Sequence, residues 1–157
     1  MYRFCAFLLA VLSLHAQTPP KTKGPSAAVK AMVAYTLTSS NLDRYAEASS
    51  AMSALIAKDP GVLAKLKPSP TDAPNSIDET VAFTKRRCPE CVATVEKAMP
   101  YREYVLFQGG LMISYVSAIR PRHTSPVHVT PENIKFVLEN REKIDRVLAE
   151  QRTQPAR

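Results

Sequence analysis

A long stretch of the chain without a charged residue runs from Tyr104 to Ile119, with the sequence YVLFQGGLMISYVSAI. Arg102 and Glu103 precede it, and Arg120 follows it. A helix that is apolar nearly all round is buried by protein on every side or lies in lipid. A membrane span needs about 20 consecutive apolar residues, and this run is shorter. The pattern therefore favours a helix buried inside a small protein and predicts no transmembrane span in the mature chain.

The boundaries of this helix follow from its flanking prolines. Pro100 fits the first helical turn, and Pro121 ends the helix after Arg120. Gly109 and Gly110 weaken an isolated helix, but they let a second backbone approach closely. The pattern therefore predicts a central helix over about 100–120.

Other stretches combine helical spacing of apolar residues with capping residues at their starts. Thr38, Ser76 and Thr130 are the expected N-caps, and Glu79 completes a capping box with Ser76. The predicted helical ranges are 37–58, 62–67, 76–88, 89–99 and 130–151. The positions expected to be buried on the longer ones are Leu42, Tyr45, Met52, Leu55, Ile56, Ile77, Val81, Thr84, Ile134, Val137, Leu138, Ile144, Val147 and Leu148. Strand-like alternation is not evident, so the sequence predicts an all-α fold, a bundle of four to five helices around the central one.

Two of these helix starts share a pattern. Asn41 follows Thr38 by three residues, and Asn133 follows Thr130 in the same way. The similarity does not continue along the helices. It is interpreted as common capping chemistry rather than as a duplicated module.

The N-terminal residues 1–16 have the three parts of an export signal. Arg3 gives a positive start, Phe4 to Leu14 is apolar, and Ala16 is a small residue before the expected cut. The sequence therefore predicts an exported protein, periplasmic or extracellular after cleavage near Ala16. Residues 17–36 are expected to be a flexible lead-in rich in Pro and Lys, within which 26–35 could be helical or extended. Residues 37–152 are the predicted bundle domain, and 153–157 a frayed tail.

The length and the net charge of the chain limit the classes of partner that it is expected to bind. The chain has 157 residues, enough for one domain, and a formal net charge of +7. A basic surface can indicate nucleic acid, but an exported protein meets anionic envelope material instead. The expected partner is an unidentified protein or an anionic envelope component, with no nucleic acid and no cofactor. Short basic runs next to helix ends supply the candidate anion-binding residues: Lys85, Arg86, Arg87, Arg120 and Arg122.

Cys88 and Cys91, in the sequence CPEC, form the motif with the clearest chemical content. An oxidising compartment favours a disulfide between them. The closed loop is very short, so the bridge stabilises the fold only weakly, which leaves room for a redox role. No βαβ pattern of a thioredoxin-like domain surrounds the motif. A structural disulfide, a pair of partly buried thiols and a thiol–disulfide or redox-latch role all stay open.

Metal, haem and hydrolytic sites are not predicted. Haem attachment needs a His after the second cysteine, where this chain has Val92. His123 and His128 lie beyond an apolar helix, not at the end of a zinc-finger loop. Common hydrolase and nucleotide-binding motifs are missing. The sequence therefore assigns neither catalytic nor metal-binding residues.

Four segments resemble a loose group of small exported bacterial proteins that are entirely helical. They are the start of the first long helix (37–45), the Asp59-Pro60 stop, the sequence PYREY at 100–104, and TPENIKFV at 130–137. The resemblance implies an exported helical domain, and it implies no activity and no catalytic residue.

The leading functional interpretation is a non-enzymatic structural or interaction module. The first alternative is the redox role of Cys88 and Cys91. The second is a carrier of a small apolar ligand, with Gly109, Gly110 and Met112 near a cavity.

Overall fold

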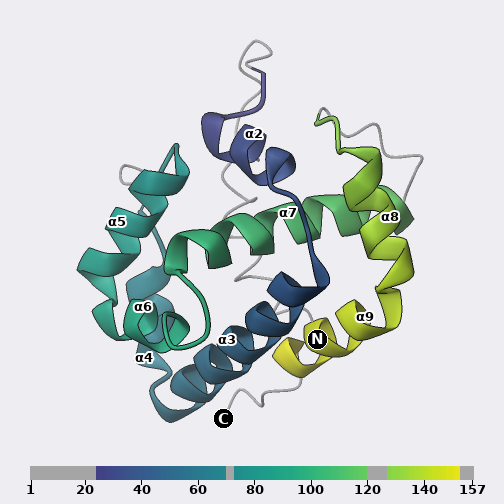
Figure 1. Ribbon diagram of the computed structural model, residues 1–157. Coiled ribbons are helices and arrows are strands. Elements are labelled where there is room, and N and C mark those ends of the chain that lie inside the picture. Colours follow the sequence, from purple (N-terminus) through teal and green to yellow (C-terminus); the bar gives the residue numbers. More distant parts are fainter. Residues whose placement is uncertain (1–23, 70–72, 120–126, 153–157) are drawn as a thin grey trace.

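The computed structural model describes residues 24–69, 73–119 and 127–152, and these ranges contain eight helices and no strand (Figure 1). The predicted all-α class is confirmed. The helices are α2 (Ala27–Ala34), α3 (Ser39–Lys58), α4 (Gly61–Leu66), α5 (Ile77–Arg87), α6 (Pro89–Val95), α7 (Tyr101–Ile119), α8 (Pro131–Glu139) and α9 (Arg141–Arg152). The expected signal segment 1–16 and the tail 153–157 lie outside the described residues.

Helix α7 is the central element that the sequence predicted. It crosses the middle of the structure, with α2 and α3 on opposite sides, α5 towards one end and α8 towards the other (Figure 1). Its buried residues lie on several sides of the helix, as a helix surrounded by others requires: Tyr101, Tyr104, Val105, Leu106, Phe107, Gly110, Leu111 and Ser114. Within the described ranges, no helix is long and apolar enough to cross a membrane.

Aromatic rings fill the space between α3 and α7. Tyr45 of α3 is fully buried, and its ring centroid lies 5.1 Å from that of Phe107 and 5.3 Å from that of Tyr104. The Tyr35 ring meets Phe107 edge-on at 6.4 Å. Aromatic pairs at these separations stabilise a core beyond the area that they bury.

The glycine pair allows α2 to pack closely on α7. A Cβ at Gly110 would lie 2.6 Å from the Met32 carbonyl oxygen, and one at Gly109 would lie 2.3 Å from the Met32 sulfur. Met32 thus fills the space beside both glycines, where the carrier hypothesis placed a cavity. Met112 is partly buried and packs against the core. Close helix packing explains the two glycines.

Part of the expected flexible lead-in is packed. Residues 27–34 form α2, and Met32 and Val33 are buried. The Ser26 hydroxyl accepts a hydrogen bond from the Val29 N–H (3.3 Å), and the Ala28 N–H donates to the Asn75 carbonyl (3.4 Å). The packed body therefore begins before residue 37, because α7 offers an apolar surface that α2 covers.

The three predicted N-caps are confirmed. The hydroxyl of Thr38, Ser76 or Thr130 accepts a hydrogen bond from the backbone N–H three residues on, at 3.2, 3.1 and 3.3 Å. The capping box of Ser76 and Glu79 differs from the predicted arrangement in one hydrogen bond. The Glu79 carboxylate accepts from the Asn75 N–H at 2.7 Å, one residue before the N-cap.

The last helix was predicted as one element over 130–151, and this is wrong. Asn140 separates α8 from α9. Its backbone N–H and its side-chain amide both donate to the Phe136 carbonyl (3.0 and 2.9 Å), which ends α8. The Asn140 carbonyl then accepts from the Ile144 N–H (3.0 Å), which begins α9.

This break also explains a wrong burial prediction. Leu138, expected in the core, is 54% exposed, while Phe136 is buried. Each short helix buries its own apolar set, so one continuous helical face does not describe both. The helix expected over 89–99 also ends earlier, at Val95, and a turn leads to α7.

Candidate functional site

The two candidate cysteines lie at the corner between α5 and α6. Pro89 disfavours a helical conformation at the preceding residue, and Cys88 has φ −146° and ψ 70°. Cys88 therefore ends α5 and also precedes the first residue of α6. The Cys91 N–H donates to the Cys88 carbonyl at 3.0 Å, so the turn closes on itself. The Cα atoms are 5.3 Å apart, and the sulfurs form a disulfide.

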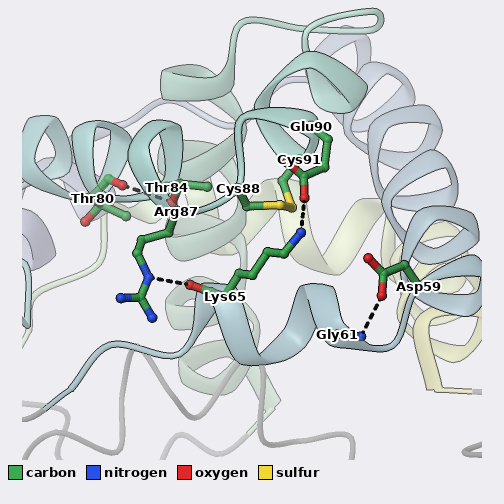
Figure 2. Close-up of a disulfide and its surroundings, with 9 residues drawn as sticks. All are labelled: Asp59, Gly61, Lys65, Thr80, Thr84, Arg87, Cys88, Glu90 and Cys91. Carbon is green, nitrogen blue, oxygen red and sulfur yellow. Dashed lines mark hydrogen bonds and ion pairs between the residues drawn. A yellow bond between two sulfur atoms is a disulfide. The ribbon is translucent and has the colours of Figure 1, made fainter.

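The disulfide is completely buried, since Cys88 and Cys91 are both 0% exposed. Helix α4 runs past it, and Figure 2 shows the Lys65 side chain extending beside the sulfurs to Glu90. The Lys65 ammonium lies 2.6 Å from the Glu90 carboxylate. The Arg87 guanidinium Nε–H donates to the Lys65 carbonyl at 3.4 Å. Helix α4 is thus tied to both sides of the corner.

The ion pair between Lys65 and Glu90 shifts the pKa of both side chains. The hydrogen bond from Lys65 lowers the pKa of Glu90, and the same bond raises the pKa of Lys65. Both shifts favour the charged forms, and the two side chains are partly exposed to water. The pair therefore helps to orient α4 over the corner but contributes little to stability.

Thiol–disulfide exchange requires a thiolate to approach one of the two sulfurs. With both cysteines buried, an external thiol reaches neither sulfur unless the corner opens. The geometry is that of a brace which fixes the angle between α5 and α6. It does not present a sulfur to a partner.

The basic candidates at the end of α5 have different surroundings. Lys85, Arg86 and Arg87 are all exposed. Arg87 contacts the protein itself, through Lys65 and through its guanidinium carbon, which lies 5.8 Å from the Phe83 ring centroid. Lys85 and Arg86 make no side-chain hydrogen bond or ion pair with any residue in the described ranges.

The structure leaves two of the proposed basic residues untested. Arg120 and Arg122 lie outside the described residues, so a joint patch with the end of α5 stays a prediction. His123 lies there too, and His128 is exposed. Across the described parts of the chain, no three His, Cys, Asp or Glu side chains gather in a way that could hold a metal ion.

A pocket between α3 and α9 was not predicted. Its volume is about 310 Å³, and it is lined by Ala46, Ser49, Ser50, Ser53, Val147, Glu150 and Gln151. The sequence carries a signal for it, the run of Ser and Ala in α3, since short side chains fill less of the space between two helices. The pattern of large apolar residues does not reveal such a gap.

Comparison with known proteins does not assign the chain to a family. No protein-family model, curated protein or solved structure matches the chain. The similarity of its caps and helix starts to small exported helical proteins therefore stays a resemblance of short motifs.

Proposed function

We propose that this chain is an exported helical interaction protein that binds an anionic component of the cell envelope through the exposed end of α5. The observation that carries the proposal is the state of Lys85 and Arg86. Both are exposed, and neither is paired with an acid among the described residues. Cations that are not neutralised by their own protein are available to an anionic partner.

The disulfide corner supports this role. Residues Lys85 to Arg87 immediately precede Cys88, and the buried bridge fixes the end of α5 to α6. A basic site held in a defined position loses less conformational freedom on binding. In this proposal the cysteines brace the site and have no redox function.

Export is part of the proposal. Its support is the signal-like sequence of residues 1–16, together with a disulfide, which persists in oxidising compartments. A mature chain starting near Gln17, with Cys88 and Cys91 oxidised, is the expected form in an envelope fraction. Intact-mass measurement of that fraction tests this point.

Binding is tested by sedimentation with vesicles that contain phosphatidylglycerol, compared with vesicles of phosphatidylcholine alone. The double variant Lys85→Ala/Arg86→Ala is expected to bind the anionic vesicles about thirtyfold more weakly, since each cation near such a surface contributes about 1 kcal/mol. Binding of the wild type should also weaken as salt is added.

The matched control is Lys135→Ala/Arg146→Ala, which removes the same charge from α8 and α9. Those helices lie on the other side of the structure from α5 (Figure 1). The control is expected to retain most of the binding. If the two double variants lose equal amounts of vesicle binding, the binding depends only on the net charge of the protein. That result would refute a specific site at the end of α5.

A further inference from the structure

The charges of α5 are separated along its axis. Its two acids lie in the first turn, and its three bases, the basic end of α5, lie in the last. At a rise of about 1.5 Å per residue, Glu79 is about 9 Å from Lys85 along the axis, which exceeds the screening length of about 8 Å at physiological salt. The other acid, Asp78, is paired with the Arg102 guanidinium at 2.9 Å. The acids of α5 therefore do little to oppose its own basic end.

Glu90 is the acid that lies nearest to this basic end along the chain, three residues after Arg87. The disulfide corner lies between them, and it turns the chain so that the Cα atoms of Cys88 and Cys91 are 5.3 Å apart. Glu90 therefore stays close to the end of α5 instead of extending away from it. An unpaired carboxylate in this position would repel an anionic surface that approaches the basic end.

Lys65 of α4 neutralises that carboxylate. Its ammonium lies 2.6 Å from the Glu90 carboxylate, and the two side chains are 44% and 37% exposed. Figure 2 shows the Lys65 side chain extending past the disulfide to Glu90. The Lys65 backbone carbonyl also accepts a hydrogen bond from the Arg87 guanidinium at 3.4 Å. One residue of α4 thus holds a cation of the basic end and is paired with the acid next to it.

We propose that Lys65 is a positioning residue of the anion-binding site, which keeps the Glu90 carboxylate neutralised so that the basic end of α5 attracts an anionic partner. This inference rests on the proposed function. Lys85 and Arg86 contact the partner, and Lys65 acts on binding through Glu90. An ion pair between exposed side chains contributes little to folding, so the effect of Lys65 is expected in binding rather than in stability.

Sedimentation with vesicles that contain phosphatidylglycerol tests this role. Lys65→Met removes the ammonium but keeps the apolar stem and the backbone carbonyl that accepts from Arg87. It is expected to weaken binding about fivefold, the effect of one charge worth about 1 kcal/mol near such a surface. Lys65→Arg, which keeps the cation, should bind as the wild type does. Both variants should unfold at the temperature of the wild type.

Two double variants separate a local effect from net charge. Lys65→Met/Glu90→Gln and Lys65→Met/Glu139→Gln both have the net charge of the wild type, but only the first removes the carboxylate close to the basic end. Glu139 lies in α8, 3.7 Å from Lys135. The first double variant is expected to bind as tightly as the wild type. The second should bind about fivefold more weakly, as Lys65→Met alone does.

Equal binding by these two double variants would overturn the inference, as would wild-type binding by Lys65→Met. So would a loss of binding in Lys65→Met that comes with a lower unfolding temperature and is not restored by Glu90→Gln, since Lys65 would then serve the fold. In each case the proposed function stands as long as Lys85→Ala/Arg86→Ala binds weakly. Wild-type binding by Lys85→Ala/Arg86→Ala would refute the proposed function and this inference with it.

Discussion

The side chain of Asn133 binds the backbone of Leu37 across 96 positions of sequence. Its Oδ1 accepts a hydrogen bond from the Leu37 N–H at 3.0 Å, and its Nδ2 donates to the Tyr35 carbonyl at 2.9 Å. Asn133 is only 2% exposed. The first turn of α8 therefore holds the linker between α2 and α3, which lies outside both helices.

Asn133→Ala is expected to reduce the free energy of unfolding by about 3 kcal/mol, because it leaves a buried N–H and a partly buried carbonyl without these partners. Urea unfolding followed by circular dichroism measures the change. Asn41→Ala is the matched control. Asn41 occupies the equivalent position of α3, and its amide donates to the Tyr35 hydroxyl (2.8 Å), so about 1 kcal/mol is expected. Equal losses of unfolding free energy in the two variants would mean that the hydrogen bond between Asn133 and Leu37 adds no stability beyond that of an ordinary side-chain hydrogen bond.

The two glycines of α7 are expected to respond differently to alanine. At Gly110 the new Cβ would meet the Met32 carbonyl oxygen, part of the backbone, so α2 must shift, at about 2 kcal/mol. At Gly109 it would meet the end of the flexible Met32 side chain. Rearrangement of that side chain and the better helix propensity of Ala should keep Gly109→Ala within about 1 kcal/mol of the wild type. Thermal unfolding of the two variants tests the order, and a larger loss at Gly109 would contradict the close approach of the α2 backbone.

The disulfide is expected to stabilise the fold modestly. The bridge joins residues three positions apart, and closing so short a loop in the unfolded chain is worth about 2 kcal/mol. The double variant Cys88→Ala/Cys91→Ala should therefore fold with the same helical content and unfold at a lower urea concentration. Loss of the folded state in this variant would show that the corner matters far more than its loop length predicts.

Reduction of the disulfide should be slow in the native protein. Because both cysteines are buried, glutathione is expected to react only when the corner opens, so the rate should rise steeply with low concentrations of urea. Alkylation and mass spectrometry at timed intervals give the rate. Rapid reduction in the absence of urea would contradict the role of a brace and would favour the redox function for Cys88 and Cys91.

Stability is expected to fall as the pH rises above about 10, the ordinary pKa of tyrosine. Burial raises the pKa of Tyr45 and of Tyr104 in the folded protein. Above about pH 10 the unfolded chain loses these protons while the folded chain keeps them, so ionisation favours unfolding. Below that pH the contribution is fully present. Urea unfolding between about pH 8 and pH 11 should show the decline, and Tyr104→Phe should make it shallower. An unchanged slope in that variant would mean that Tyr104 is not responsible.

Local patterns in the sequence were sufficient for the class of the fold and for several of its details. The absence of charge from 104 to 119 identified α7, because such a helix must be covered on every side. The caps at Thr38, Ser76 and Thr130 were predictable, since each bond joins residues only three positions apart. Pro89 likewise placed the α5–α6 corner, since a proline restricts the residue before it.

The candidate sites were predictable only in part. The sequence identified Cys88 and Cys91, but the chain fold decided that both are buried and that α4 runs past them (Figure 2). It identified the basic run at 85–87, yet it could not separate Arg87, which contacts Lys65 and Phe83, from Lys85 and Arg86. The pocket between α3 and α9 gave no strong signal, because a gap depends on which two helices face each other.

The sequence by itself determined most of the helices, the three N-caps and the order of the buried stretches, since these depend on contacts within a few residues along the chain. The tertiary structure alone decided the role of Asn133 and the packing of Met32 on the glycine pair. Each of these depends on a surface supplied by a distant segment, and a single residue's type does not reveal which segment that is.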